Sequence, residues 1–542
     1  MVAKIDLITR EVIRGGLEYI AEEMGIILRN AAYSANIKER MDHSCSLFDG
    51  TGRMIAQAEH IPVHLGAMPL VVKRVMEHFE GEIFAGDSFI VNDPYLGGTH
   101  LPDITIITPV FYQETLVGFS VSRAHHNDIG GIAPGSMAGN ATDIFQEGLR
   151  IPPIKFVSKG VINKDIMALI MTNSRTPQIR KGDLLAQLSA NWTGEKRLVE
   201  IVKNKGVKTF FQAIDEILDY SERRFLSAIK NFPQKNSSAI DYLDGDGIRS
   251  KKIPLKIKLS LRKNHFHFDF TGTAAQVAGA VNCPFAVTLS AAYFVVRAIT
   301  DPTIPANDGL YRHLTVTAPE GSLLNACPPA AVVGGNVETS QRIVDVLLRA
   351  FAKIVPERIP AASQGTMNNL IIGGLTSTNS PFTFYETIGG GSGGRPIKDG
   401  VDGIHTHMTN TMNTPIEEIE VRYPLIVEEY SLRENSGGKG QFRGGLGIVR
   451  KFKAKVPVIV SVLGERQKTA PWGLEGGLPG LKGRYYKVTL AGKEVTIDGK
   501  TTITLAAGES IVIETPGGGG WGNLAKRGQA LIDSDHLDEK MA

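Results

Sequence analysis

The chain has few cysteines, almost no excess charge and no long hydrophobic run, and each absence excludes a class of protein. Only Cys45, Cys283 and Cys327 occur, without a CxxC pair, so neither a disulfide framework nor a cysteine zinc site is indicated. A net charge of +3 is too small to predict binding to nucleic acid or to a membrane surface. No segment approaches the roughly 18 apolar residues of a membrane span, and the first residues lack the apolar core of a secretory signal. We therefore expect a cytoplasmic protein.

Signatures of nucleotide binding and of serine catalysis are also missing. Without a G-x-x-x-x-G-K-[ST] phosphate loop, ATP is not expected to bind this chain, and no G-x-S-x-G elbow supplies a nucleophile. Residues 389–394 and 517–522 match the dinucleotide pattern G-x-G-x-x-G in letters. The first match is not followed by a helical pattern, and the second lies too close to the C-terminus for a βαβ unit. We expect both to be glycine-rich turns.

The length of 542 residues predicts two to four domains with ample core. We predict a multidomain α+β fold, with mixed helices and sheets and a β-rich C-terminal region. The predicted parts are an N-terminal α+β domain over 1–235, a central α/β-type domain over 236–415 and a β-rich domain over 416–542. The polar stretch 231–246 is the first candidate boundary, because turn-forming residues dominate it.

Hydrophobic periodicity gives the expected elements. Apolar residues at three- and four-residue steps predict a long helix from residue 6 to about 34, and further helices over 183–230, broken near Gly206, and over 345–355. Short β-branched runs between glycine-rich turns predict strands. The runs are 87–93, 104–111, 116–122, 253–272 (a strand pair), 456–464, 484–492 and 508–518.

Two polar clusters border neighbouring strand predictions. His100 and Asp103 stand three residues apart in a turn just before the run 104–111, and His125 and His126 follow the run 116–122. If these runs form an antiparallel hairpin, the loop before the first strand and the loop after the second lie side by side. That geometry brings the four side chains close together.

Imidazole and carboxylate together suit Zn, Mn, Fe or Co. Asp42 is a possible fourth ligand. The alternative is an ordinary turn, since His-x-x-Asp arises readily by chance and turns favour Asp for backbone hydrogen bonding.

Five other residues lie outside these two clusters. His265 and His267 alternate along a strand and are expected to share an ordinary face. Cys45 is expected to be a buried structural thiol. His405 and His407 flank a threonine, and we treat them as possible residues of a substrate pocket.

Seven separated segments carry a resemblance to a known family. They are ERMDHSCSLFD (39–49), NDPYLGGTHLPD (92–103), SRAHHNDIGG (122–131), GGNVETSQR (334–342), YETIGGGSGG (385–394), THMTNTMNTPIEEIE (406–420) and TPGGGGWG (515–522). In this order they resemble the hydantoinase B family over almost the whole chain. That family includes the matching half of 5-oxoprolinase, the metal-bearing subunit of caprolactamase and the alpha subunit of acetone carboxylase.

The resemblance implies a site in the N-terminal domain. Asp42, His100, Asp103 and His125 fall on the family's metal ligands, and Zn or Mn are the metals that we expect. His126 would orient substrate or water as a catalytic residue. For two ligands a neighbour is an alternative: His43 in place of Asp42, and His126 in place of His125.

The resemblance also implies a function. The chain would be the metal-binding subunit of an ATP-dependent hydrolase that opens a cyclic amide such as a hydantoin, 5-oxoproline or a lactam. A hydantoinase A-like partner subunit would bind ATP and Mg and phosphorylate the carbonyl, which a metal-activated water would then attack. A heterotetramer or larger assembly is implied, with no nucleic acid or membrane as partner. The alternatives are a ketone carboxylase subunit related to acetone carboxylase and a non-catalytic structural subunit.

Overall fold

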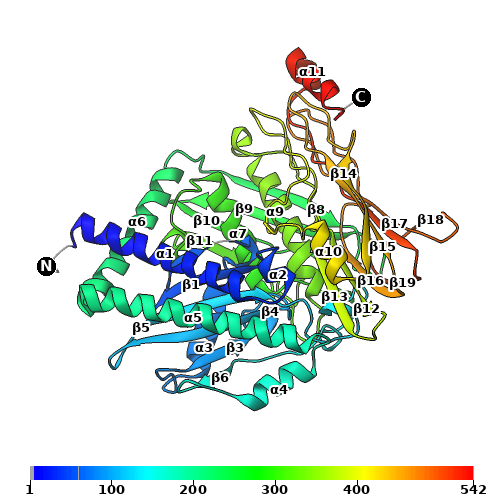
Figure 1. Cartoon of the computed structure of the whole chain (residues 1–542). Helices are drawn as coiled ribbons and strands as arrows, with labels where there is room; N and C mark the ends of the chain where they lie inside the picture. The colour runs from blue at the N-terminus through cyan, green and yellow to red at the C-terminus, as the bar shows by residue number, and fades with distance from the viewer. Residues whose placement is uncertain (1–4, 59, 541–542) are drawn as a thin grey trace.

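The computed structural model describes residues 5–58 and 60–540, and these contain eleven α-helices and twenty strands in four sheets. The expected α+β class is confirmed. No helix within the described residues is long and apolar enough to cross a membrane. Figure 1 shows the N-terminal helices along one side of the molecule and the β-rich C-terminal part at the other.

Three long helices form the outer layer beside the first sheet. The predicted N-terminal helix is α1 (Leu7–Ala31), which begins where Asp6 accepts a hydrogen bond from the Thr9 amide (2.9 Å). The predicted break near Gly206 separates α5 (Pro177–Lys205) from α6 (Val207–Ile229), because Gly206 has a φ of 83° that ends the first helix. Figure 1 shows α1 and α5 lying side by side.

The first sheet has seven strands in the order β2-β1-β5-β4-β3-β6-β7. Its strands are β1 (His43–Asp49), β2 (Met54–Ala58), β3 (Ser88–Val91), β4 (Asp103–Tyr112), β5 (Thr115–His125), β6 (Ile154–Ser158) and β7 (Val161–Ile162). The predicted hairpin is confirmed, since β4 and β5 pair antiparallel across the two-residue turn 113–114. Its register places Asp103 directly opposite His125.

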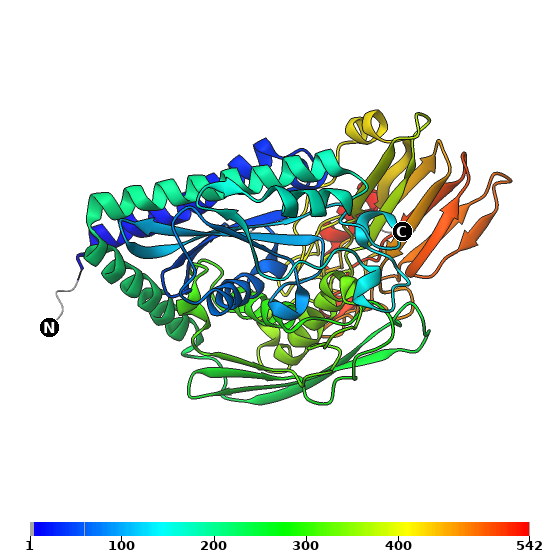
Figure 2. The same ribbon diagram turned by 90° about the horizontal axis from the view of Figure 1, so that it is seen from below.

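Below the first sheet lie a layer of helices and then the second sheet, as Figure 2 shows. The helices are α3 (Ala67–His78), α7 (Phe285–Ile299) and α9 (Ser340–Phe351), the last being the helix predicted over 345–355. α3 packs against α7, and α7 and α9 pack on a four-stranded sheet of order β11-β10-β9-β8. Its strands are β8 (Asn236–Leu243), β9 (Ile253–Arg262), β10 (His265–Asp269) and β11 (Leu314–Thr317). The remaining short helices in this half are α2 (Ala35–Lys38), α4 (Lys164–Thr172) and α8 (Asp308–Tyr311).

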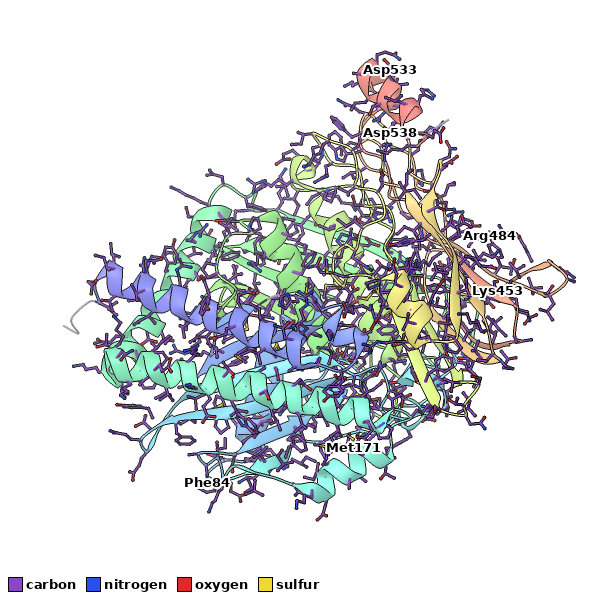
Figure 3. The ribbon with its side chains drawn as sticks, in the orientation of Figure 1. Phe84, Met171, Lys453, Arg484, Asp533 and Asp538 are labelled. Atoms are coloured by element: carbon purple, nitrogen blue, oxygen red, sulfur yellow. The ribbon has the colours of Figure 1, made fainter. Side chains whose placement is uncertain are left out.

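Two further sheets form the β-rich end of the molecule. The third sheet has the order β13-β12-β16-β19 and the fourth the order β14-β15-β20-β17-β18. Their strands are β12 (Asn369–Leu375), β13 (Pro381–Thr387), β14 (Leu425–Arg433), β15 (Gly447–Ala454), β16 (Val458–Leu463), β17 (Arg484–Val488), β18 (Glu494–Thr496), β19 (Lys500–Leu505) and β20 (Ser510–Glu514). Exposed charged side chains such as Arg484 point away from these sheets (Figure 3).

The end of the chain is β-rich but not all β. Two helices, α10 (Ile416–Arg422) and α11 (Gln529–Leu537), flank its strands. The predicted division at residue 415 stays a prediction. The third sheet crosses it, because β12 pairs with β16 over positions 369–374 and 458–463.

The glycine-rich segments at this end lie against one another with no room for side chains. A Cβ on Gly391 would lie 1.9 Å from the Gly445 carbonyl oxygen, and one on Gly518 would lie 2.0 Å from the Ser392 carbonyl oxygen. Neither G-x-G-x-x-G stretch opens a helix after a strand. The glycines therefore serve close backbone approach rather than dinucleotide binding, as expected.

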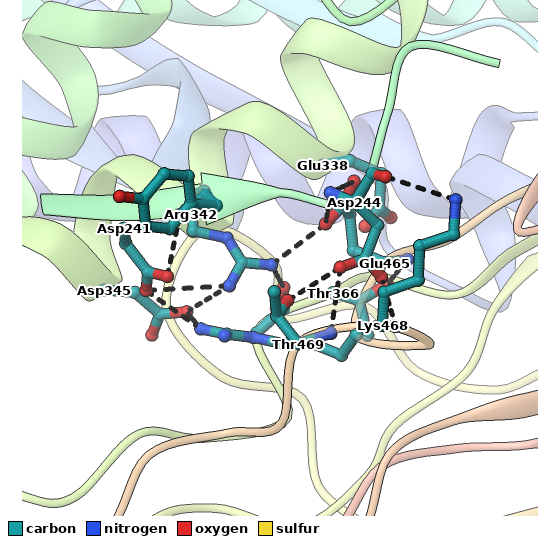
Figure 4. Close-up of polar contacts among 12 residues, drawn as sticks. Asp241, Asp244, Glu338, Arg342, Asp345, Thr366, Glu465, Lys468 and Thr469 are labelled. Atoms are coloured by element: carbon teal, nitrogen blue, oxygen red, sulfur yellow. Dashed lines mark hydrogen bonds and ion pairs between the residues drawn. The ribbon is translucent and has the colours of Figure 1, made fainter. Parts of the chain in front are cut away.

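A buried network of charges joins the second sheet, α9 and the segment after β16 (Figure 4). Arg342 of α9 lies 3.1 Å from Glu465, and Arg466 lies 2.5 Å from Asp345. Lys500 of β19 pairs with the other oxygen of Glu465. We call this set the charge network; its members are Asp241, Arg342, Asp345, Glu465, Arg466 and Lys500.

Candidate metal centre

The hairpin brings three predicted ligands into one compact group at the end of the first sheet. Nε2 of His100 lies 3.0 Å from Oδ1 of Asp103, and Nδ1 of His125 lies 3.2 Å from the same oxygen. The two imidazole nitrogens are 3.1 Å apart. All three side chains are buried, and we call them the metal group.

The spacing within the metal group suits a divalent ion. Ligand atoms at about 2.0–2.1 Å from a tetrahedral zinc lie roughly 3.3 Å from one another. The three separations in the metal group are close to that length. Nδ1 of His100 and Nε2 of His125 have no hydrogen-bond partner among the described residues, so the rings are not fully bonded by the protein alone.

The protonation states of the side chains in the metal group also favour the binding of a cation. Burial raises the pKa of Asp103, but the nearby His100 and hydrogen bonds from the imidazoles outweigh burial and hold this pKa well below its usual range. Burial lowers the pKa of His125, which keeps its ring neutral. A carboxylate and a neutral imidazole are the forms that bind metals. The residues present therefore fit a divalent ion.

The second oxygen of Asp103 is held by three donors that we did not predict. Thr99 Oγ1 lies 2.5 Å away, Asn336 Nδ2 3.3 Å and His64 Nε2 3.6 Å. The nearby sequence gives no signal for Asn336, which lies 233 residues along the chain from Asp103. His64 could have been considered from the histidine-bearing stretch EHIPVH at 59–64. These contacts leave Oδ1 facing the two imidazoles.

Asp42 lies beside the metal group but outside it. Its backbone oxygen accepts a hydrogen bond from the His125 amide (3.0 Å), and its carboxylate accepts one from Asn36 Nδ2 (3.4 Å). Asp42 is not among the residues whose ligand atoms all lie within 4.8 Å of one another. The structure thus brings together three of the four predicted ligands, with the fourth next to them.

His43 and His126 lie on the other face of the first sheet. His126 Nε2 is 2.8 Å from Gln187 Oε1 of α5, and burial lowers the pKa of this ring to about 3. The His43 ring lies 4.9 Å from that of His60, and burial lowers its pKa to about 3 as well. Because neighbours on a strand point to opposite faces, His125 rather than His126 joins the metal group.

Three further side chains, those of Tyr385, Arg40 and Arg123, lie near the metal group without having been predicted. The ring of Tyr385 stacks on His125, with centroids 4.8 Å apart, and the guanidinium carbon of Arg40 lies 4.6 Å from the centroid of the same tyrosine ring. Arg123 is on the same face as His125, two residues earlier on β5, and its guanidinium is buried with one hydrogen bond, to Thr105 (2.8 Å). Its positive charge helps to stabilise the carboxylate of Asp103.

His407 lies beside the charge network, and His405 lies near Arg40. His407 Nε2 is 3.7 Å from Asp345, and both ring nitrogens of His405 are buried without a hydrogen-bond partner among the described residues. Gln341 of α9 donates to the Thr406 carbonyl oxygen between them (3.0 Å). By contrast, His265 and His267 bond Thr315 and Thr317 on one exposed face of the second sheet, as predicted.

Comparison with known proteins gives the family. Residues 6–524 match the family model described as Hydantoinase B/oxoprolinase, so the chain belongs to this family. An uncharacterized protein of Methanocaldococcus jannaschii is 46% identical over 541 residues, covering 99% of this chain and 94% of that protein. 5-Oxoprolinase 1 of Arabidopsis thaliana is 41% identical over 530 residues, covering 93% of this chain. The match covers only 41% of the Arabidopsis protein, so this chain spans about two fifths of its length.

Two solved structures share the fold. The ATP-dependent caprolactamase from Pseudomonas jessenii superposes with a TM-score of 0.93 at 29% identity, covering 99% of this chain and 95% of that one. Acetone carboxylase superposes with a TM-score of 0.91 at 18% identity, covering 98% of this chain and 78% of that one. At that identity the second likeness is one of fold alone.

Proposed function

We propose that this chain is the metal-binding subunit of an ATP-dependent amidohydrolase that opens a cyclic amide such as a hydantoin, 5-oxoproline or a lactam. The observation that carries the proposal is the buried metal group of His100, Asp103 and His125, with ligand atoms 3.0–3.2 Å apart. The names of two similar proteins, 5-oxoprolinase and ATP-dependent caprolactamase, support the substrate class. Oxoproline and caprolactam are both cyclic amides.

In this proposal the side chains of the metal group hold a divalent ion, with Asp42 completing the set. When bound, the ion would lower the pKa of a coordinated water and polarise a carbonyl oxygen. The absence of thiolate ligands favours Zn or Mn in an all-nitrogen and oxygen site. Burial of the metal group excludes bulk water, which strengthens each electrostatic contact there. Thr99 and Asn336 orient Asp103 so that one carboxylate oxygen faces the imidazoles.

We assign His126 a positioning role rather than contact with substrate. Its amide donates to the Pro102 carbonyl oxygen (2.8 Å), and its ring bonds Gln187 on the far side of the sheet. These bonds tie the end of β5 to the loop that carries His100 and Asp103. His405 and His407, whose ring nitrogens are incompletely bonded, remain our candidates for the substrate pocket.

An amide is a poor electrophile, and we propose that a partner subunit phosphorylates its carbonyl oxygen. The partner would be hydantoinase A-like and would bind ATP and Mg, because this sequence has no phosphate loop. We propose that the two kinds of subunit form a heterotetramer or a larger assembly. A cytoplasmic location agrees with three free cysteines. The likeness to acetone carboxylase, at 18% identity, gives no support for ketone carboxylation beyond the fold.

Elemental analysis of the purified chain, beside a His100→Ala, Asp103→Ala double variant, tests the proposal. We expect about one equivalent of Zn or Mn in the natural chain and almost none in the variant. The loaded chain is then assayed with its partner subunit, ATP and a lactam or 5-oxoproline. Absence of metal from both proteins after supplementation would refute the mechanism and favour a structural subunit. ATP use with a ketone and bicarbonate, but not with a lactam, would favour the carboxylase.

A further inference from the structure

A short π-helical turn, Gly335–Thr339, lies directly before α9 and contacts the metal group at Asp103; we call it the π-turn. All five of its residues are buried. Gly335 permits the turn, because a Cβ there would lie 1.8 Å from the Asn282 carbonyl oxygen. π-Helical turns are rare and occur frequently at functional sites. We therefore followed each polar side chain of the π-turn to its contacts.

One polar side chain of the π-turn, that of Asn336, contacts Asp103 directly. Asn336 Nδ2 donates to Oδ2 of Asp103 at 3.3 Å, beside the bond from Thr99. Oδ2 is the oxygen that points away from His100 and His125. Asn336 thus helps to fix which carboxylate oxygen faces the imidazoles.

A second side chain of the π-turn, that of Glu338, is connected to His125 through Asn369 and Tyr385. Glu338 Oε1 accepts from Asn369 Nδ2 (2.9 Å), and Asn369 Oδ1 accepts from the hydroxyl of Tyr385 (2.9 Å). The Tyr385 ring stacks on His125 at 4.8 Å with an interplanar angle of 23°. All of these side chains are buried, so solvent does not compete for their bonds. The π-turn is thus connected to Asp103 by one hydrogen bond and to His125 through Asn369 and Tyr385.

We propose that Asn336 and Glu338 of the π-turn are positioning residues for the metal group, Asn336 acting on Asp103 and Glu338 acting through Asn369 and Tyr385 on His125. This inference rests on the proposed function, in that it takes the metal group to hold a divalent ion. Its physical basis is preorganisation. A ligand set held at the spacing of a coordinated ion loses little freedom on binding, whereas rings free to tilt must be ordered by the ion itself.

A Glu338→Gln variant tests the role of Glu338 specifically, because the hydrogen bond that Glu338 accepts from Asn369 does not require a negative charge. Burial, together with the nearby Glu465, raises the pKa of Glu338 to about 8, so the carboxyl is mostly protonated at neutral pH. Its bonded oxygen acts as an acceptor for Asn369 and for the Met367 amide (3.0 Å). Glutamine keeps that acceptor in a neutral side chain of the same length. Alanine removes it.

The test measures Zn affinity of the full-length chain by competition with a chromophoric chelator, and the visible absorption of the Co²⁺-loaded protein. We expect Asn336→Ala and Glu338→Ala each to weaken Zn binding about 10- to 100-fold, the loss typical of outer-shell partners. Both should change the Co²⁺ absorption bands, because the ligand geometry shifts. Glu338→Gln should restore natural affinity and spectrum. Asp308→Asn is the control, a half-buried carboxyl that accepts a hydrogen bond from the Met54 amide (3.1 Å), away from the metal group and the π-turn.

The outcomes separate this inference from the proposed function. Natural Zn affinity and an unchanged Co²⁺ spectrum in a folded Glu338→Ala chain would overturn the inference and leave the metal site standing. Equal loss in the glutamine and alanine variants would also overturn it. A natural chain that binds no Zn would instead refute the proposed function. If Glu338→Ala does not fold, Tyr385→Phe removes only the hydroxyl bond to Asn369, and an unchanged spectrum in that variant would overturn the inference.

Discussion

The metal group and the charge network are both fully buried and polar, yet they differ in how their charges are paired. In the charge network each carboxylate faces a guanidinium or ammonium group, as Glu465 faces Arg342 (3.1 Å) and Lys500. In the metal group Asp103 faces three imidazoles, those of His100, His125 and His64, together with a hydroxyl and an amide. The first set pairs its carboxylates with cations of the chain, whereas the second converges two imidazole nitrogens and one carboxylate oxygen on one point.

The difference teaches how to separate a structural cluster from a ligand site in this fold. A buried carboxylate needs a partner of opposite charge, because desolvation is otherwise costly. The charge network meets that need within the chain and joins the second sheet, α9, the segment after β16 and the strand β19. The metal group meets it only in part, and a divalent ion would complete it. The predictions below test this contrast.

The largest effect on stability is expected from Glu465→Gln. The change leaves Arg342 and Lys500 buried without their shared carboxylate, which should lower the free energy of unfolding by about 3–5 kcal/mol. Denaturant unfolding followed by circular dichroism measures it. Glu434→Gln on the exposed surface is the control and should stay within about 0.5 kcal/mol. Equal stability in the two variants would show that the charge network is not structural.

Asp103→Asn should show the opposite behaviour, a large change in metal binding. Removal of a ligand charge should weaken Zn binding by more than roughly 100-fold, about 2.7 kcal/mol, which exceeds the loss of an outer-shell partner. Competition with a chelator measures the affinity. Asp49→Asn, a buried aspartate at the far end of the same sheet, should lower stability but retain the metal. A metal affinity in Asp103→Asn equal to that of the natural chain would place the ion elsewhere.

The hairpin shows what local pattern could predict. Two β-branched runs separated by a short polar turn pair in one way, and the pairing itself sets Asp103 opposite His125. Strand alternation likewise decides between His125 and His126 once the facing side of the sheet is known. His100 follows because it precedes Asp103 by a single turn. The core of the candidate site was therefore predictable from sequence.

The surroundings of the site could not be predicted in the same way. Asn336 and Tyr385 reach the metal group from more than 200 residues away, and their approach depends on how α9 and β13 pack against the first sheet. No periodicity in the sequence encodes that packing. The pairing within the third sheet could not be predicted either, because β12 and β16 are separated along the chain by β13, β14 and β15. Local signals predict elements, whereas tertiary contacts decide their neighbours.

Glu338 is linked to the metal group through Asn369 and Tyr385, and it lies near Glu465 of the charge network. Its titration therefore offers a pH-dependent test of how the two buried clusters differ. Its pKa is raised to about 8, so the folded chain keeps a proton that the unfolded chain loses near the ordinary value. The unfolded state then binds fewer protons, and stability falls as pH rises from about 5 to about 8, by up to about 1.4 kcal/mol per pH unit for this group. Glu338→Gln should remove that contribution from the slope. Unfolding measured at several pH values in both chains checks it, and parallel curves would contradict the assignment.

The smallest effect is expected at His265 and His267, which share the residue type of the metal group but not its setting. Their rings bond Thr315 and Thr317 on an exposed face of the second sheet. The double variant His265→Gln, His267→Gln should therefore keep its metal and change the free energy of unfolding by no more than about 0.5 kcal/mol. Elemental analysis and denaturant unfolding measure both quantities. Loss of the ion from this variant would mean that paired histidines alone are enough to bind it. The convergence of two imidazoles on one buried carboxylate would then no longer define the site.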